Sequence, residues 1–115
     1  MSTLRVTTLA TQAGVEVYTA KAWVNFNGTG TVAIRASGNV SSITDNGTGD
    51  YTINFTNAMA DANFSVAGWA RVSGAGGTFA GVDNTPLTTT SARIGTFNNS
   101  GTISDALFVT AAFFR

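Results

Sequence analysis

The chain has 115 residues, no histidine and no cysteine, and its six basic and six acidic side chains leave it without net charge. This inventory excludes imidazole acid–base catalysis, a histidine-based catalytic triad, His-ligated zinc and thiolate chemistry. The balanced charge also provides no field that would attract nucleic acid or an anionic membrane. We therefore expect one domain that is not an enzyme, uses no metal or cofactor, and neither binds nucleic acid nor inserts into a membrane.

The N-terminal region shows no apolar segment of a secretory signal, and no run approaches the roughly 18 apolar residues that cross a membrane. Synthesis in a cytoplasm is expected. The stretch Thr3–Leu9 has some strand character, but its role is the least certain in the chain. We expect residues 1–19 to form an N-terminal arm or docking strand, and residues 20–115 to form the folded domain.

A first hairpin is predicted just after this arm. Apolar and polar residues alternate there with the period of a half-buried strand, and the segment 27–30 (NGTG) supplies residues suited to a tight turn. The positions expected to share the apolar face are Ala22, Val24 and Phe26 before the turn, and Val32, Ile34 and Ala36 after it.

A second hairpin is predicted around Asn46-Gly47, the strongest turn signal in the sequence. We expect Gly47 to have a positive φ, with Tyr51, Ile53 and Phe55 facing inward beyond the turn. Asp45 and Asp50 flank this turn, and a calcium loop is one interpretation of them. The alternate positions are glycines, which offer only carbonyl ligands, so we favour aspartates that cap the turn.

The second half of the chain continues in short strands. The segment 57–63 lacks alternation and is expected to be a loop or a single helical turn. Pro86 belongs to a turn or an edge because it cannot donate to a strand ladder. About seven or eight strands with little helix predict an all-β fold, an antiparallel, jelly-roll-like β-sandwich or a small barrel. The expected strands are 64–72, 78–82, 88–97 and 106–114.

The last of these strands is apolar on both faces. Leu107, Val109, Ala111 and Phe113 are expected in the core, which directs Phe108 and Phe114 the other way. Large exposed apolar patches usually mark interfaces. Phe108 and Phe114 are therefore predicted interface residues of a closed homo-oligomer, and the alternative is a loop of the same chain that covers them.

Two tryptophans also lie opposite the apolar face of their strands. Trp23 has Lys21 and Asn25 as neighbours, and Trp69 has Arg71. An exposed ring beside polar groups is a stacking platform for a glycan, whereas large rings also contribute much of the contact area between subunits. We favour burial of Trp23 and Trp69 at an interface and keep glycan binding as the alternative.

Two stretches carry a family resemblance: KAWVNFNGTG at 21–30 and NVSSITDNGTGDYT at 39–52. They resemble a block of bacteriophage tail fibre and related virion structural proteins, and the closing Phe113-Phe114-Arg115 is similar to the way these domains end. The resemblance implies a β-rich, trimeric module in the virion, at the end of a fibre that attaches to the host surface. Its partners would be further copies of itself, other phage structural proteins and a host surface glycan.

About twenty residues precede the shared block, which leaves no room for a fibre shaft in this sequence. Two alternatives to a tail appendage therefore stay open. The first is a capsid decoration, or cement, protein that stabilises the head and docks through its N-terminal arm. The second is a free carbohydrate-binding module.

Overall fold

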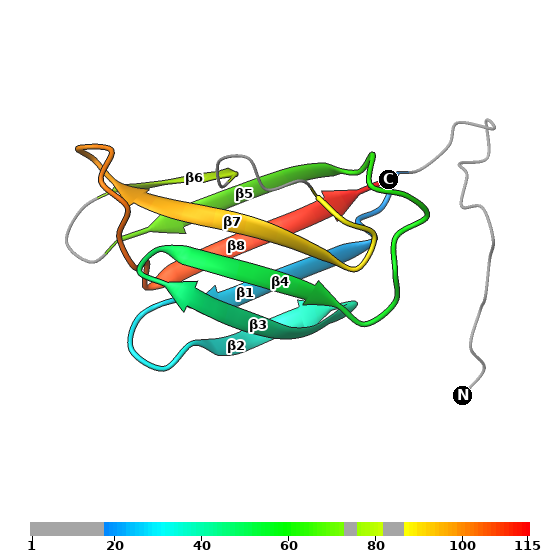
Figure 1. Ribbon diagram of the computed structural model, residues 1–115, viewed down its shortest axis with the longest axis horizontal. Helices are drawn as coiled ribbons and strands as arrows, with labels where there is room; N and C mark the ends of the chain where they lie inside the picture. Colours follow the sequence, from blue (N-terminus) through cyan, green and yellow to red (C-terminus); the bar gives the residue numbers. More distant parts are fainter. Residues whose placement is uncertain (1–17, 73–75, 82–86) are drawn as a thin grey trace.

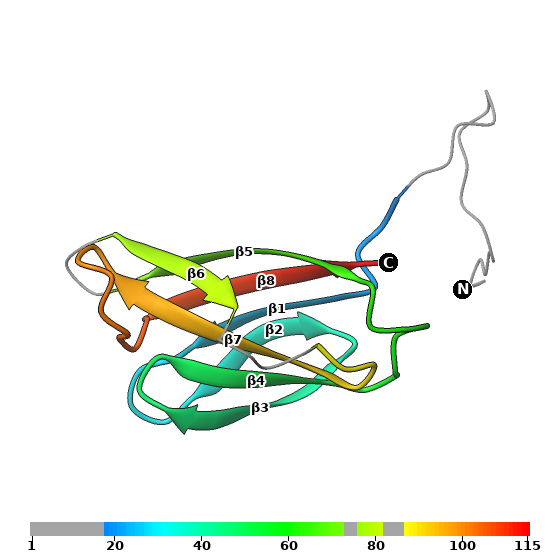
Figure 2. The same cartoon turned by 45° about the horizontal axis from the view of Figure 1, so that its top comes forward.

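The computed structural model describes residues 18–72, 76–81 and 87–115. These residues form two antiparallel four-stranded sheets packed face to face, with strand orders β2-β1-β8-β5 and β3-β4-β7-β6 (Figures 1 and 2). The expected all-β sandwich is thus confirmed. The strands are β1 Ala22–Asn27, β2 Ala33–Gly38, β3 Val40–Gly47, β4 Asp50–Phe55, β5 Ser65–Arg71, β6 Gly77–Gly81, β7 Ser91–Asn98 and β8 Phe108–Phe114.

The two ends of the folded chain meet in the first sheet, but the strand order differs from that of a jelly roll, in which β2 would pair with β7 and β3 with β6. The first strand β1 pairs with the last strand β8, and nested inside this pair β4 pairs with β7 in the other sheet. Both predicted hairpins are present, as β1–β2 and β3–β4. The described residues contain no helix, and so none that could cross a membrane.

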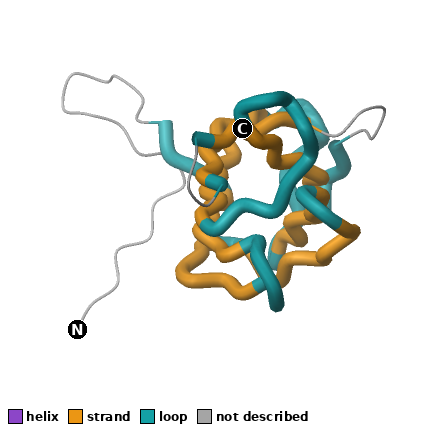
Figure 3. Tube along the Cα trace, turned by 90° about the vertical axis from the view of Figure 1, so that its left-hand side faces the viewer, coloured by secondary structure: helices purple, strands orange, loops and turns teal. Residues whose placement is uncertain are grey.

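The core lies between the sheets, which enclose it when the sandwich is viewed end-on (Figure 3). Because successive side chains of a strand point to opposite faces, each inner strand contributes every second residue. Phe55, Phe64 and Phe113 meet edge to face, with ring centroids 5.0 to 5.9 Å apart. The largest fully buried side chains are Tyr51, Phe26, Phe113, Ile53, Val24 and Val109.

The first hairpin departs from the expected alternation. Asn25 pairs with Ala36 but Phe26 pairs with Ile34, so the register shifts and Arg35 is the extra residue of a β-bulge. Because paired residues share a face, Ile34 lies on the inner side of the sheet with Phe26, where it is still 37% exposed, and Ala36 lies on the outer side. The prediction that these two residues share an apolar face was wrong.

The second hairpin has the predicted turn. Gly47 has a φ of 135°, and its backbone N–H donates to Asp45 Oδ1 at 3.0 Å, which is the expected Asx turn. Asp50 Oδ1 accepts a hydrogen bond across the turn from Asn46 Nδ2 at 3.4 Å. Its carboxylate also accepts two hydrogen bonds from Arg93 of β7, at 2.8 and 2.5 Å, so Asp50 links two neighbouring strands as well.

Some expectations fall outside the described residues, namely the possible strand Thr3–Leu9, Pro86 and the greater part of the N-terminal arm. The described chain begins at Tyr18 and enters β1 at Ala22, while the boundary at residue 20 stays a prediction. The segment 57–63 is a loop, and the C-terminal strand begins at Phe108. Leu107 therefore precedes that strand and is only partly buried.

Candidate contact face on the outer side of the first sheet

The outer side of the β2-β1-β8-β5 sheet carries the chain's exposed tryptophans, and we call it the aromatic face. Strand register arranges it in rows. Trp23 of β1 and Ala67 of β5 both lie opposite Ala112 of β8, and in the next row Asn25 and Trp69 both lie opposite Thr110. The two tryptophans thus lie on the strands that flank β8, in adjacent rows.

Both tryptophans are accessible, with 43% of Trp23 and 53% of Trp69 exposed. The Trp23 indole lies against Gly38 of the neighbouring strand β2, where a β-carbon would collide with the ring. A shallow hollow of about 510 Å³ lies beside Trp23, above the alanines of β8 and β5. The tryptophans predicted from the sequence are therefore brought onto one face, and glycine and alanine residues leave room around them.

Phe108 and Phe114 lie on the same face but differ in exposure. The guanidinium of Arg35 lies 4.4 Å from the centre of the Phe108 ring, and its Nη2 donates to the Leu107 carbonyl at 2.7 Å. The β-bulge aims Arg35 across β1 toward β8, so Phe108 is partly covered by its own chain. Phe114 lies at the end of the face and is 38% exposed.

Charge on the aromatic face is confined to its margin. Lys21 precedes Trp23 on the outer side of β1, Arg71 closes β5 opposite Phe108, and Arg35 lies over the Phe108 ring. All three charges are positive. The centre of the face, by contrast, contains aromatic, small and uncharged polar side chains.

The outer side of the second sheet, which we call the polar face, has the opposite character. Its side chains hydrogen-bond to one another: Asn54 Nδ2 donates to Ser42 and Thr44 hydroxyls at 3.1 and 3.0 Å, and Asn46 Nδ2 donates to Thr52 at 2.7 Å. The two sheets therefore present unlike surfaces to the outside.

The aspartates of the described chain serve structural roles. Guanidinium hydrogen bonds hold the pKa of Asp50 below its ordinary value, and Arg115 lowers the pKa of Asp61 to about 2. Asp105 Oδ1 accepts hydrogen bonds from the Gly49 N–H and from the buried Tyr51 hydroxyl, at 2.8 and 3.1 Å. Within the described ranges, acidic side chains do not gather into a group that could hold a metal ion.

Sequence reasoning found the four aromatic residues but missed how they are arranged. The bulge that places Arg35 over Phe108 depends on pairing between strands, which alternation within one strand does not reveal. Gly38 carried a usable signal, because a glycine beside a strand end permits close approach of a ring. Comparison with protein-family models, curated proteins and solved structures found no match to this chain.

Proposed function

We propose that this protein is a homotrimeric structural module of a phage virion, in which copies pack through the aromatic face. The observation that carries the assembly is the contrast between the two outer surfaces. A polar face that satisfies its own hydrogen bonds suits contact with water. A face with two exposed tryptophans among alanines is unfavourable to leave in water, and aromatic patches of this kind mark interfaces.

The distribution of charge supports the same assignment. Interfaces between proteins are depleted of charged residues at their centre and enriched in aromatic residues and arginine. Here the centre holds Trp23 and Trp69 with small neighbours, and Lys21, Arg35 and Arg71 lie at the margin. The margin can stay hydrated while the centre is buried.

The signs of these charges favour a ring of subunits over a twofold dimer. In a twofold dimer the same patch meets itself, so the positive margins of two aromatic faces would be brought together. A cyclic assembly instead places each face against a different surface of the next subunit. Asp45, at the exposed β3–β4 turn, forms no ion pair with the described residues and offers a complementary charge. Threefold closure is the arrangement that the family resemblance implies.

The virion assignment rests on the resemblance of residues 21–30 and 39–52 to tail fibre proteins. We favour a tail appendage that attaches to the host surface and keep capsid decoration as the alternative location. Counting copies in purified virions that carry this gene tests both. Tens of copies or fewer indicate the tail, hundreds indicate the capsid, and absence from the particle would contradict a virion role.

A carbohydrate-binding module is the second candidate function, favoured by the hollow beside Trp23. Aromatic side chains with a few polar groups are typical of ligand sites. The two functions differ in the state of the free protein. A binding module would keep Trp23 and Trp69 accessible in solution, whereas the trimer would bury them, so iodide quenching of tryptophan fluorescence distinguishes the two.

A further inference from the structure

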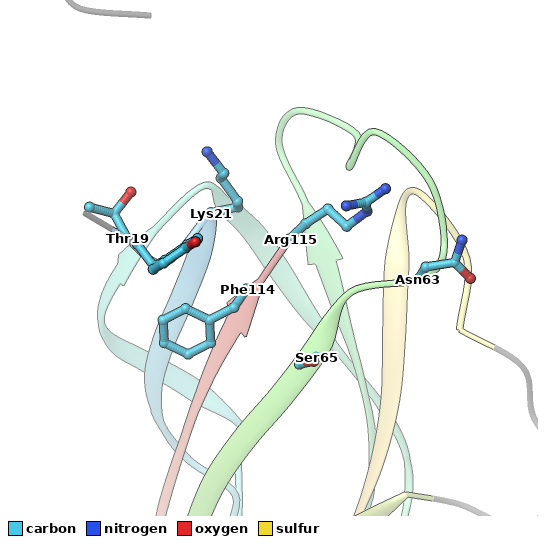
Figure 4. Close-up of a pocket in the computed structure, with 7 residues that line it drawn as sticks. Thr19, Lys21, Asn63, Ser65, Phe114 and Arg115 are labelled. Carbon is cyan, nitrogen blue, oxygen red and sulfur yellow. The ribbon is translucent and has the colours of Figure 1, made fainter. Parts of the chain in front are cut away.

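A second hollow, distinct from the centre of the aromatic face, lies where β1 begins and β8 ends. It has a volume of about 290 Å³, close to the smaller ligand pockets, which start at about 300 Å³. Figure 4 shows Lys21 and Arg115 extending beyond the strand ends, with the Phe114 ring below them. The hollow is lined by Tyr18, Thr19, Lys21, Asn63, Ser65, Phe114 and Arg115.

The lining combines three kinds of group. Phe114 and the 80%-exposed Tyr18 supply aromatic surface. Ser65 supplies a hydroxyl, which can donate and accept hydrogen bonds, whereas the Asn63 side chain hydrogen-bonds to Asp61. Lys21 supplies an ammonium group. Aromatic surface with a few convergent polar groups is the usual composition of a small-molecule site.

The two cations of this hollow are not equivalent. Arg115 donates from Nε and Nη2 to the two carboxylate oxygens of Asp61, at 2.7 and 2.6 Å, so its charge is already matched. Lys21 forms no ion pair within the described part of the chain. Its ammonium is therefore the group left to receive an anion, and its single charge is balanced in full by one carboxylate.

We propose that this hollow binds an acidic monosaccharide unit, with its carboxylate at Lys21 and its ring against Phe114. The size of the hollow accommodates one sugar ring, and Ser65 lines it with a hydroxyl that can hydrogen-bond to the sugar. Lys21 and Arg115 also line a neighbouring hollow of about 370 Å³ above Met59. This inference goes beyond the proposed assembly and does not depend on it, because the hollow lies at the end of the sheet, past the row of Trp23.

Sodium glucuronate and glucose form a matched pair of probes, since they differ by the carboxylate. Each is titrated into isotope-labelled full-length protein while backbone amide resonances are followed. Glucuronate is expected to shift the amides around Lys21, Ser65 and Phe114 at millimolar concentration, and glucose to bind at least about tenfold more weakly. Equal binding of the two sugars, or shifts centred on Trp23 and Trp69, would overturn the proposal.

Two variants, one of a lysine and one of an arginine, test the role of charge. Lys21→Met keeps most of the aliphatic stem and is expected to weaken glucuronate at least about fivefold. Arg71→Met makes the same charge change at the far end of the aromatic face and should leave binding unchanged. If both variants weakened glucuronate binding equally, only the net charge of the protein would matter. That result would contradict a specific site at Lys21.

Sodium acetate and inorganic phosphate complete the test. Acetate carries the carboxylate without the ring and is expected to bind more weakly than glucuronate, because Phe114 then has nothing to contact. Phosphate binding as strong as that of glucuronate would overturn the proposal in favour of a general anion site. Circular dichroism of each variant, matched to wild type, confirms that losses of binding are not losses of fold.

Discussion

At the scale of single residues, Tyr51 joins three parts of the chain. Its side chain is fully buried, and its hydroxyl contacts the Gly28 carbonyl at 2.8 Å and Asp105 Oδ1 at 3.1 Å. Burial and the neighbouring carboxylate raise the pKa of Tyr51 to about 12. Gly28 must stay a glycine, because a β-carbon there would collide with the Tyr51 ring.

The raised pKa predicts a loss of stability at high pH. The folded state holds the Tyr51 proton more tightly than the unfolded chain, whose tyrosine pKa is about 10. The shift therefore contributes about 2 to 3 kcal/mol to the free energy of unfolding. This contribution is complete below about pH 10 and is lost as the pH rises toward 12. Urea unfolding at pH 8 and pH 11.5 measures the change. Tyr51→Phe should unfold more easily at pH 8 but show a smaller further loss at pH 11.5, and an unchanged pH dependence would contradict this assignment.

Asn39 is a second residue with a defined structural role. It has a φ of 55°, and its Nδ2 donates to the Lys21 and Asn57 carbonyls, both at 3.1 Å, while its Oδ1 accepts from the Asn57 N–H at 2.7 Å. Asn39 thus fixes the loop after β4 to the start of β1. The side-chain hydrogen bonds and the backbone conformation of Asn39 contribute separately to the stability of the fold.

Asn39→Gly removes the side-chain hydrogen bonds but tolerates the positive φ. Asn39→Ala removes the hydrogen bonds and also disfavours the positive φ. We expect both variants to be destabilised, with the alanine variant worse by roughly 1 kcal/mol. Chemical denaturation of the pair measures this difference. Equal stability of the two variants would show that the backbone conformation is relaxed in solution.

At the scale of elements, Asp50 and Arg93 connect β4 with β7 on the polar face. Because Arg93 lowers the pKa of Asp50, the pair stabilises the fold above the unfolded pKa of about 4, and this stability is lost as the pH falls below that value. The side chains are partly exposed, 16% for Asp50 and 36% for Arg93, so we expect at most about 1 kcal/mol.

Asp50→Asn should therefore lower the urea midpoint at pH 7 and have little effect at pH 2. Asp45→Asn is the matched control, because Asp45 lies in the adjoining turn without an ion pair among the described residues. A pH-independent effect of Asp50→Asn would argue against the ion pair as the cause.

The elements also show what the sequence could predict. Alternation is a local property, so it identified both hairpins and the inward-facing Val109, Ala111 and Phe113. It could not predict that β8 lies between β1 and β5, that Asp50 meets Arg93, or that a bulge turns Arg35 outward. Each of these depends on pairing between segments far apart in the chain. The candidate contact face was therefore predicted as four aromatic residues, not as a surface.

At the scale of the whole molecule, the fold is expected to need no metal ion. A chelator should leave the melting temperature unchanged, and calcium should not raise it. A drop of more than a few degrees with chelator would point to the loop between Asp45 and Asp50 as a calcium site, with these two carboxylates as its first candidates.

The two outer surfaces of the sandwich predict different consequences for assembly. Trp69→Asp places a charge at the centre of the aromatic face and should dissociate the assembly while leaving the β-sheet spectrum intact. Removing a buried aromatic contact makes the free energy of association less favourable by roughly 2 to 3 kcal/mol, which weakens affinity about 30- to 150-fold per interface. Thr78 is exposed and pairs with Phe97 on the outer side of the second sheet, so Thr78→Asp is the matched control and should not change the oligomeric state.

Light scattering coupled to size-exclusion chromatography, on the unmodified protein at micromolar concentration, tests the central claim most directly. The chain mass is 11.8 kDa. We predict a single species with three times that mass, and the Trp69→Asp variant at the mass of one chain. A stable monomer of the unmodified protein would contradict assembly through the aromatic face and would favour a monomeric carbohydrate-binding module.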